Sequence, residues 1–361
     1  MRAIAVTLVL AAHAGAWEPW RGDPVFEKFV YPLVLGENGV LIFFTLSGFL
    51  ITHLLLREHR RTGRINYRYF LARRALRLLP AFAIFWLILL ALTLGGYYDI
   101  PPASFAFAAA YLYNFIPKHY YSGYFGLTWS LGVEEQFYLL WPLVLRLRKA
   151  PDLRPLIYWT TAVFIAGSVV FMAWVPDLSL PAYEVSADGK TLNLADFSVG
   201  RVFFPYRWFI PMGSYLLLGC SAAALVNGPN WRRRWKSFSM VHLAGLAGML
   251  IFSPLYIDFL PYFPLKLLLT TGITFLLIYL YAEQQGRWVR VLEWAPLRHL
   301  GKLSYGLYLY SGIFLATGIA EPDYWWQTLP LALVLTYLLA LASHLTVEKW
   351  FLQRKDRFRE A

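Results

Sequence analysis

Long apolar segments alternate with short polar connections along nearly all of the 361 residues. A transmembrane helix needs about 20 consecutive, mainly apolar residues. Segments that approach or exceed this length lie near residues 2–20, 33–56, 76–96, 127–147, 156–175, 208–227, 239–256, 263–283, 302–319 and 328–350. The pattern predicts an all-α fold, a polytopic membrane helix bundle of about ten transmembrane helices.

The apolar segment 104–116 is shorter than the others. It is too short to cross a bilayer easily, and irregular backbone is tolerated at membrane depth only where protein covers it. We therefore expect a re-entrant or interfacial segment here, which keeps the number of spans even.

Lysine and arginine gather in alternate connections. The basic clusters lie at residues 57–77, 146–154, 232–236, 287–302 and 349–359, whereas the intervening connections 97–102 and 321–327 are poor in both residues. Because cytoplasmic loops carry the excess of Lys and Arg, this bias predicts that both termini are cytoplasmic. It also indicates a multi-pass protein of the cell inner membrane, whose basic loops contact membrane lipids.

Composition supports a membrane protein, since 58% of residues are apolar and only 15% are charged. The net charge of +12 comes mostly from the basic connections that orient the protein in the membrane. We therefore expect no nucleic-acid partner. A single cysteine, Cys220, excludes a disulfide within the chain and a thiolate metal cluster, and we predict no metal site. We expect one integral-membrane domain over 1–361 without a fused soluble domain. The polar outer connection near 176–207 either caps or admits a substrate, or is a solvated loop.

The first apolar segment carries Arg2 and His13, with ten residues between them. In a helix these residues are about 16 Å apart along the axis, so Arg2 can lie at the membrane surface and His13 at depth. An ionisable residue at that depth is a functional-site hypothesis, and histidine offers a nucleophile or general base. Two alternatives remain open: a buried histidine that bonds a neighbouring helix, and a signal peptide cleaved after Ala14-Gly15-Ala16.

Three arginines, Arg73, Arg74 and Arg77, lead into the third span. Residues three apart share a helix face, and guanidinium groups bind phosphate oxygens through paired hydrogen bonds. This arrangement suits a polyphosphate ligand, although it is equally typical of the positive flank of a membrane helix.

Two adjacent carboxylates, Glu134 and Glu135, lie inside an apolar helix, where they are costly unless paired or protonated. Adjacent side chains point about 100° apart, so we expect different roles: one to pair with an arginine or orient His13, the other to bind a polar acceptor. A structural ion pair is the alternative.

The sequences of two segments with hydroxyl side chains favour a role in packing between helices. Ser47-Gly48 permits close approach of helices, and Ser304-Tyr305-Gly306-Leu307-Tyr308 offers hydroxyls that bond across helices. His242 and His344 lie in or near spans without clear partners, and none of the remaining histidines has clear metal-ligand spacing. The sequence contains no Gly-rich phosphate loop or nucleophile elbow.

Taken in order, these segments resemble acyltransferase family 3, the bacterial integral-membrane O-acyltransferases. The resemblance is carried by Arg2 to Val6 with His13, FFTLSGFLIT at 43–52, Arg74-x-x-Arg77, WSLGVEEQFYLLWP at 129–142, and SYGLYL at 304–309. It implies about ten spans, an acyl-CoA donor, usually acetyl-CoA, and a hydroxyl acceptor on a carbohydrate, lipid or small molecule. Tyr310-Ser311 stands where the family often has a histidine, so we assign no proton transfer to this helix.

The resemblance implies roles for the residues that match its motifs. Arg2 and His13 match an essential Arg-x10-His pair, and Arg74 and Arg77 match a second arginine motif. We expect acyl-CoA phosphates at Arg2, Arg73, Arg74 and Arg77, catalysis by His13, Glu134 and Glu135, and acceptor or structural roles for Ser47, Tyr138, Ser304 and Tyr305. No cofactor is bound permanently in this account, and the acceptor is a surface polysaccharide, a lipid-linked sugar or a small glycoside. A proton-coupled transporter that uses buried Arg, His and Glu is the alternative function.

Overall fold

A computed structural model describes most of the chain. The described residues are 1–16, 18–20, 22–26, 30–148, 150–178, 184–187, 190–193, 198–231, 262–282, 286–315 and 324–358. They divide into two compact units, which are treated separately below. The first comprises Met1–Tyr67, Trp141–Phe164 and Ser214–Tyr305, and the second comprises Arg68–Leu140, Ile165–Gly213 and Gly306–Ala361. The predicted span 239–256 and the basic cluster 232–236 lie outside the described residues.

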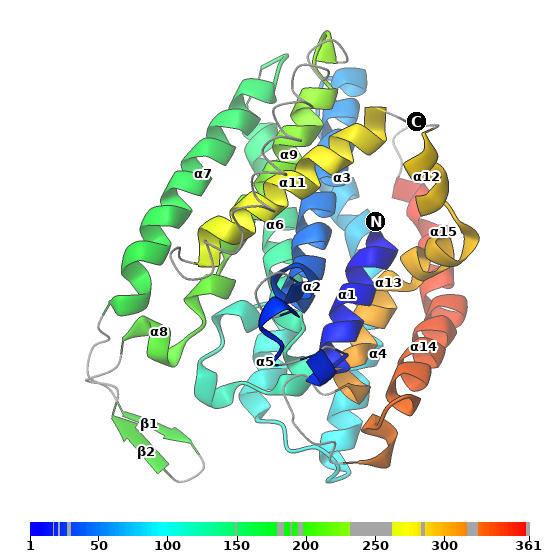
Figure 1. The fold of residues 1–361 in the computed structure, drawn as a ribbon. Coiled ribbons are helices and arrows are strands. Elements are labelled where there is room, and N and C mark those ends of the chain that lie inside the picture. The colour runs from blue at the N-terminus through cyan, green and yellow to red at the C-terminus, as the bar shows by residue number, and fades with distance from the viewer. Residues whose placement is uncertain are drawn as a thin grey trace. The chain divides into compact units, whose positions relative to one another are not determined.

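The described structure is almost entirely helical (Figure 1). Its helices are α1 (Arg2–His13), α2 (Tyr31–Val34), α3 (Gly36–Thr62), α4 (Tyr67–Leu94), α5 (Pro102–Ala109), α6 (Thr128–Leu147), α7 (Arg154–Trp174), α8 (Val199–Val202), α9 (Phe209–Val226), α11 (Tyr262–Ala282), α12 (Arg287–Leu292), α13 (Ala295–Phe314), α14 (Leu331–Ser343) and α15 (Lys349–Arg354). Short 3-10 turns connect several of them, and a π-helical turn at His344–Glu348 joins α14 to α15.

One β-hairpin modifies the all-α prediction. Strands β1 (Glu184–Ala187) and β2 (Lys190–Asn193) pair antiparallel, with Glu184 opposite Asn193. The hairpin lies in the predicted outer connection 176–207, so part of that connection is ordered by a backbone ladder rather than being a plain solvated loop.

Five helices in the described part of the chain are long and apolar enough to cross a membrane: Gly36–Thr62, Tyr67–Leu94, Arg154–Trp174, Pro205–Val226 and Leu331–Arg354. These helices confirm a multi-pass membrane helix bundle.

The first predicted span was too long. Helix α1 has 12 residues and ends at His13, so it is about 18 Å long and shorter than the roughly 30 Å hydrocarbon core. Gly15 adopts a left-handed conformation with φ of 64°, and the Ala16 N–H donates to the Ala11 carbonyl at 3.0 Å. This is a Schellman C-terminus, and it stops the helix before residue 20.

Helix α1 packs along the first part of α3 in the first unit (Figure 1). Two glycines of α3 allow the contact: a Cβ on Gly36 would lie 2.8 Å from the Ala12 Cβ, and one on Gly39 would collide with the Ala5 carbonyl. Small residues that let helix backbones approach closely are the usual device for association in a membrane. Glycines on α3 therefore fix the position of the helix that carries Arg2 and His13.

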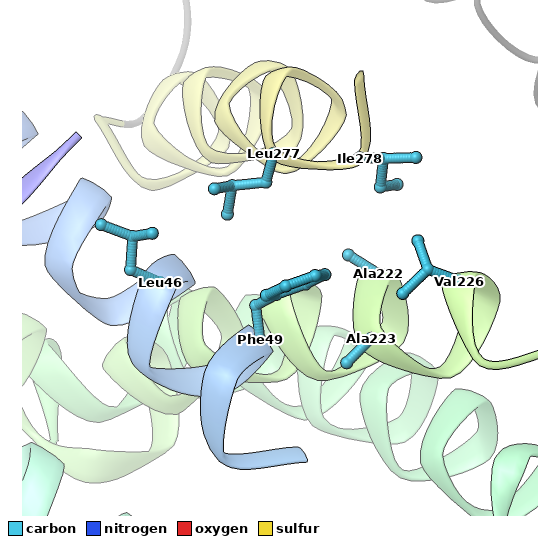
Figure 2. Close-up of a cluster of buried hydrophobic side chains, with 7 residues drawn as sticks. All are labelled: Leu46, Phe49, Ala222, Ala223, Val226, Leu277 and Ile278. Atoms are coloured by element: carbon cyan, nitrogen blue, oxygen red, sulfur yellow. The ribbon is translucent and has the colours of Figure 1, made fainter. Parts of the chain in front are cut away.

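Helices α3, α9 and α11 meet in a buried apolar cluster (Figure 2). Its members are Leu46, Phe49, Ala222, Ala223, Val226, Leu277 and Ile278. Beside the cluster, Gly48 of α3 lies against the Leu216 backbone of α9, and Gly219 of α9 lies against the Thr45 backbone of α3. The prediction that Ser47-Gly48 permits close helix approach is confirmed for Gly48.

The segment after α4 folds back on itself in the second unit. Helix α5 has only 8 residues, about 12 Å, so it does not cross a membrane. The Tyr113 hydroxyl organises the turns that follow, because it donates to the Ser122 carbonyl and accepts from the Ser122 N–H, both at 2.8 Å. Irregular backbone is thus satisfied internally, as a re-entrant or interfacial segment requires.

Candidate active site

The two ends of α1 carry its charged and titratable residues. Arg2 is the first residue of the helix and His13 the last, so they are separated by about 16 Å along its axis. The Nδ1 atom of His13 is buried and has no hydrogen-bond partner among the described residues, while the side chain as a whole is partly accessible. The alternative in which Nδ1 bonds a neighbouring helix finds no such partner in the part of the chain that the structure describes.

The Arg74 guanidinium of α4 is held against aromatic rings of its own unit. Its Cζ lies 5.3 Å from the centroid of Tyr138 on α6 and 5.6 Å from that of Phe70 on α4. Rings at this distance attract a cation through their quadrupoles. Arg74 nevertheless remains partly accessible, so it can still offer hydrogen bonds.

The second arginine motif and the Glu-Glu motif meet at Arg74. Arg77, Glu134 and Glu135 all interact electrostatically with its guanidinium. Sequence spacing alone did not establish this proximity, since the two motifs lie on different helices.

Arg73 points to a different neighbour. Its Nη1 donates to the Phe358 carbonyl at 2.6 Å, near the end of the described chain. Arg73 is predicted to bind phosphate, but at least one of its N–H donors is engaged with the C-terminal segment. The Arg77 side chain is partly accessible.

Glu134 and Glu135 have different surroundings, as adjacent helical positions require. Glu135 interacts electrostatically with Tyr111, and Glu134 with Tyr308. Both side chains are partly accessible, and both act on Arg74. The expectation of two distinct roles stays a prediction.

Gln136, next to the Glu-Glu motif, makes contacts that sequence reasoning missed. Its Nε2 donates to the Tyr111 carbonyl at 3.1 Å and to Asn114 Oδ1 at 3.0 Å, and Asn114 Nδ2 donates back at 3.3 Å. Gly132, one turn earlier on α6, faces the same two residues. The amide pair ties the segment 111–114 to the helix of Glu134 and Glu135. The signal in the sequence for these contacts was the side-chain amide of Gln136 next to two carboxylates in an apolar helix.

The hydroxyl-bearing motifs take part in packing. The Ser304 hydroxyl is buried and donates to the Gly301 carbonyl of its own helix at 3.0 Å. Across helices, the hydroxyls of Tyr308 and Ser130 are 2.6 Å apart in the second unit. In the first unit, Gly301 faces α1: a Cβ added to Gly301 would lie 3.8 Å from Ala3 N and 4.0 Å from Arg2 Cβ.

The predicted site residues divide between the two units. Arg2, His13, Ser47, Ser304 and Tyr305 belong to the first unit; the second contains Arg73, Arg74, Arg77, Glu134, Glu135 and Tyr138.

Two histidines without an assigned role have partners. His53 Nδ1 is 2.8 Å from Asn227 Nδ2, and its ring stacks on Phe49. His344 Nδ1 lies 3.4 Å from Glu348 Oε2. The prediction that His344 has no clear partner is wrong, because the π-helical turn brings this i+4 carboxylate back to the ring.

Comparison with known proteins decides the family. The acyltransferase domain model of acyltransferase family 3 matches residues 1–346. The chain belongs to this family. The resemblance carried by the five motifs is confirmed.

Curated relatives within the family are similar over much of the chain. The peptidoglycan O-acetyltransferase OatA of Listeria monocytogenes is 25% identical over 96% of this chain and 54% of its own length. The putative peptidoglycan O-acetyltransferase YrhL of Bacillus subtilis is 28% identical over 87% of this chain and 50% of its own. A putative O-acetyltransferase of Staphylococcus aureus is 30% identical over 48% of this chain and 29% of its own. The chain thus spans about half the length of the first two relatives, and no solved structure matches it.

Proposed function

We propose that the protein is a membrane O-acetyltransferase that moves an acetyl group from cytoplasmic acetyl-CoA to a hydroxyl of a cell-envelope carbohydrate. The match of an acyltransferase family model to residues 1–346 carries the proposal. Relatives named as peptidoglycan O-acetyltransferases support a glycan acceptor, such as a surface polysaccharide or a lipid-linked sugar. Membership of this family favours the enzyme over the proton-coupled transporter.

The orientation belongs to the same proposal. About ten transmembrane helices, with both termini and the basic connections in the cytoplasm, follow from the positive-inside rule. The protein then lies in the inner membrane, and its outer connections 97–127 and 176–207 face the envelope.

The arginines bind the donor in this account. Arg2 of the first unit contacts the phosphates of acetyl-CoA at the cytoplasmic face, and so do Arg74 and Arg77 of the second unit, with Arg73 beside these two. Stacking on Tyr138 and Phe70 pre-orients Arg74, which lowers the entropy cost of paired hydrogen bonds to phosphate. The pantetheine arm brings the thioester toward His13, about 16 Å along α1 from Arg2.

His13 then handles the proton of the transfer by one of two routes. As a general base it takes the proton of the acceptor hydroxyl while that oxygen attacks the thioester carbonyl. The C–S bond breaks, an ester forms, and the CoA thiolate leaves and is protonated. As a nucleophile it forms an acyl-imidazole with release of CoA, and the acceptor oxygen attacks that intermediate in a second step. Glu134 or Glu135 orients His13 or binds the acceptor.

The purified protein in lipid nanodiscs tests the proposal. Acetyl-CoA should be hydrolysed slowly without acceptor, and radiolabelled acetyl should pass to isolated cell-envelope glycan as a base-labile ester. Absence of acetyl-CoA binding and turnover, together with proton uptake by liposomes that carry the protein, would instead establish the transporter.

A further inference from the structure

A cavity of about 670 Å³ in the first unit is lined by the end of α3 and by the connection from α6 to α7. Its size falls within the range of small-ligand sites, about 300–1,000 Å³. Four arginines line it, and we call it the arginine pocket: Arg60 and Arg64 come from the α3 side, and Arg146 and Arg148 from the α6 side. None of these four residues has a role in the chemistry described so far.

The backbone around the arginine pocket is held by hydrogen bonds. His59 Nε2 of α3 lies 3.1 Å from the Ala150 carbonyl on the opposite wall, and the ring nitrogen donates, because a carbonyl oxygen only accepts. Gly63 ends α3 in a left-handed conformation with φ of 72°, and its N–H donates to the His59 carbonyl at 2.8 Å. Arg60 donates to Asn227, directly after α9. The two walls are therefore joined, and one of the four arginines has a fixed position.

The lining of the pocket carries positive charge without a carboxylate. In the part of the chain that the structure describes, no aspartate or glutamate lines it. Two acidic residues close by in the sequence bond other groups: Asp152 Oδ2 accepts from Arg154 at 2.7 Å, and Glu58 Oε1 accepts from the Asn66 N–H at 2.7 Å. All four arginines of the pocket are exposed. Cations gathered in a concave site attract an anion, and guanidinium groups favour phosphate oxygens.

The pocket also has an apolar side. Ile65 and Leu145 line it and are buried. Leu143 and Leu147 lie four residues apart on α6, so they share one helix face, and they are 38% and 73% exposed. Helix α3 is long and apolar enough to cross a membrane, so its end lies at the membrane surface. A phosphate held by Arg146 thus lies beside an apolar surface that a soluble anion would not use.

We propose that the arginine pocket binds the headgroup of an anionic phospholipid, whose acyl chains lie along Leu143 and Leu147. Basic pockets between membrane helices bind phosphorylated headgroups in this way. In the proposed orientation the site faces the cytoplasmic leaflet. The lipid site goes beyond the proposed function and does not depend on acetyl transfer. Two explanations compete with it: arginines that only orient the protein, and a second site for the phosphates of acetyl-CoA.

Cardiolipin, which carries two phosphates, is the probe, and zwitterionic phosphatidylcholine is the reference. Native mass spectrometry of the full-length protein released from detergent micelles counts the bound lipids and gives their affinities. The wild type should bind cardiolipin about tenfold or more tightly than phosphatidylcholine. Cardiolipin should also raise the midpoint of thermal unfolding, because a ligand of the folded state stabilises it. Equal affinity for the two lipids overturns the proposal.

Two pairs of substitutions separate the pocket from basic charge in general. Arg146→Gln combined with Arg148→Gln should weaken cardiolipin binding by about tenfold or more, since two contacts between arginine and phosphate are lost. Arg57→Gln combined with Arg290→Gln is the matched control. It removes the same charge from exposed positions of the first unit that do not line the pocket, and it should change the affinity by about twofold at most. Equal losses in the two pairs overturn the proposal.

A single change on the other wall gives an independent test. Arg64→Gln should also weaken cardiolipin binding severalfold. Without cardiolipin, all variants should unfold at the wild-type temperature, because the substituted side chains are exposed. Wild-type affinity in Arg64→Gln and in the Arg146→Gln, Arg148→Gln pair overturns the proposal and leaves these arginines as orientation signals.

Acetyl-CoA distinguishes the two sources of phosphate. Saturating acetyl-CoA should leave cardiolipin bound, and the Arg146→Gln, Arg148→Gln pair should keep the wild-type KM for acetyl-CoA. Displacement of cardiolipin by acetyl-CoA, with a raised KM in this pair, would assign the pocket to the donor and overturn the lipid site. Bound cardiolipin in a wild-type protein that does not turn over acetyl-CoA would reject the proposed function and keep the lipid site.

Discussion

The guanidinium of Arg74 lies 5.3 Å from the centre of the Tyr138 ring, so the second arginine motif and the VEEQFY segment meet in space although 64 positions separate these residues in the printed sequence. The ring attracts the guanidinium, and Glu134 and Glu135 interact with it electrostatically. In the proposed function, Arg74 therefore links the donor-binding arginines to the two carboxylates.

Arg74→Ala and Arg77→Ala should each raise the KM for acetyl-CoA while membrane insertion stays normal. Loss of a hydrogen bond to a charged phosphate costs about 1.5–3 kcal/mol, which corresponds to roughly a tenfold or larger change. Steady-state kinetics in nanodiscs measure the change. Arg68→Ala on the exposed side of α4 is the control. Equal KM values in all three variants would show that Arg74 and Arg77 do not bind the donor and serve only as orientation signals.

Gln136→Leu should loosen the re-entrant segment. Both of its donor bonds, to Tyr111 and Asn114, are lost, and each buried group left unsatisfied costs about 1–3 kcal/mol. Thermal unfolding in detergent should show a lower midpoint, and hydrogen exchange should increase at residues 111–114. Leu140→Ala, which removes an exposed apolar side chain from the same helix, should change neither quantity by a comparable amount.

Gly48→Ala should destabilise the crossing of α3 and α9. The added methyl group would collide with the Leu216 backbone, and overpacking of this kind costs about 1–3 kcal/mol. Gly167→Ala on α7 is a matched substitution into open space, where alanine should be neutral or stabilising by about 1 kcal/mol. Equal melting temperatures for the two variants would show that the close contact is not rigid.

Orientation is testable by labelling single introduced cysteines with a membrane-impermeant maleimide. The native Cys220 is fully buried and should remain unlabelled in the folded protein. Arg201→Cys should react in intact spheroplasts, and Arg64→Cys only after permeabilisation, since the positive-inside rule places the basic connection in the cytoplasm. The reverse pattern would contradict docking of acetyl-CoA at the arginines.

Much of the helical fold follows from hydrophobic length and periodicity, as α3, α4 and α7 illustrate. Residues 104–116 were recognised as too short to span, but the internal bonds of this region were not predictable, because the Tyr113 hydroxyl bonds to a backbone nine residues away. Helix α1 ends earlier than predicted. Gly15 was the local signal for this end, but the length of the apolar segment favoured a longer helix.

The site was predictable only in its residue types. Titratable groups in apolar helices are costly, so Arg74, Glu134 and Glu135 could be identified individually. Their mutual approach depends on the crossing of α4 and α6, which no local pattern encodes.

The central claim is that His13 carries the chemistry of acetyl transfer. His13→Ala should reduce transfer from radiolabelled acetyl-CoA to envelope glycan by about 100-fold or more, the usual loss for a general base or nucleophile. Expression, thermal stability and acetyl-CoA affinity should stay close to those of the wild type, because His13 lies at the opposite end of α1 from Arg2. His299→Ala, which removes an exposed histidine, should transfer at the wild-type rate. Wild-type transfer by His13→Ala would contradict the account and leave His13 as a packing residue.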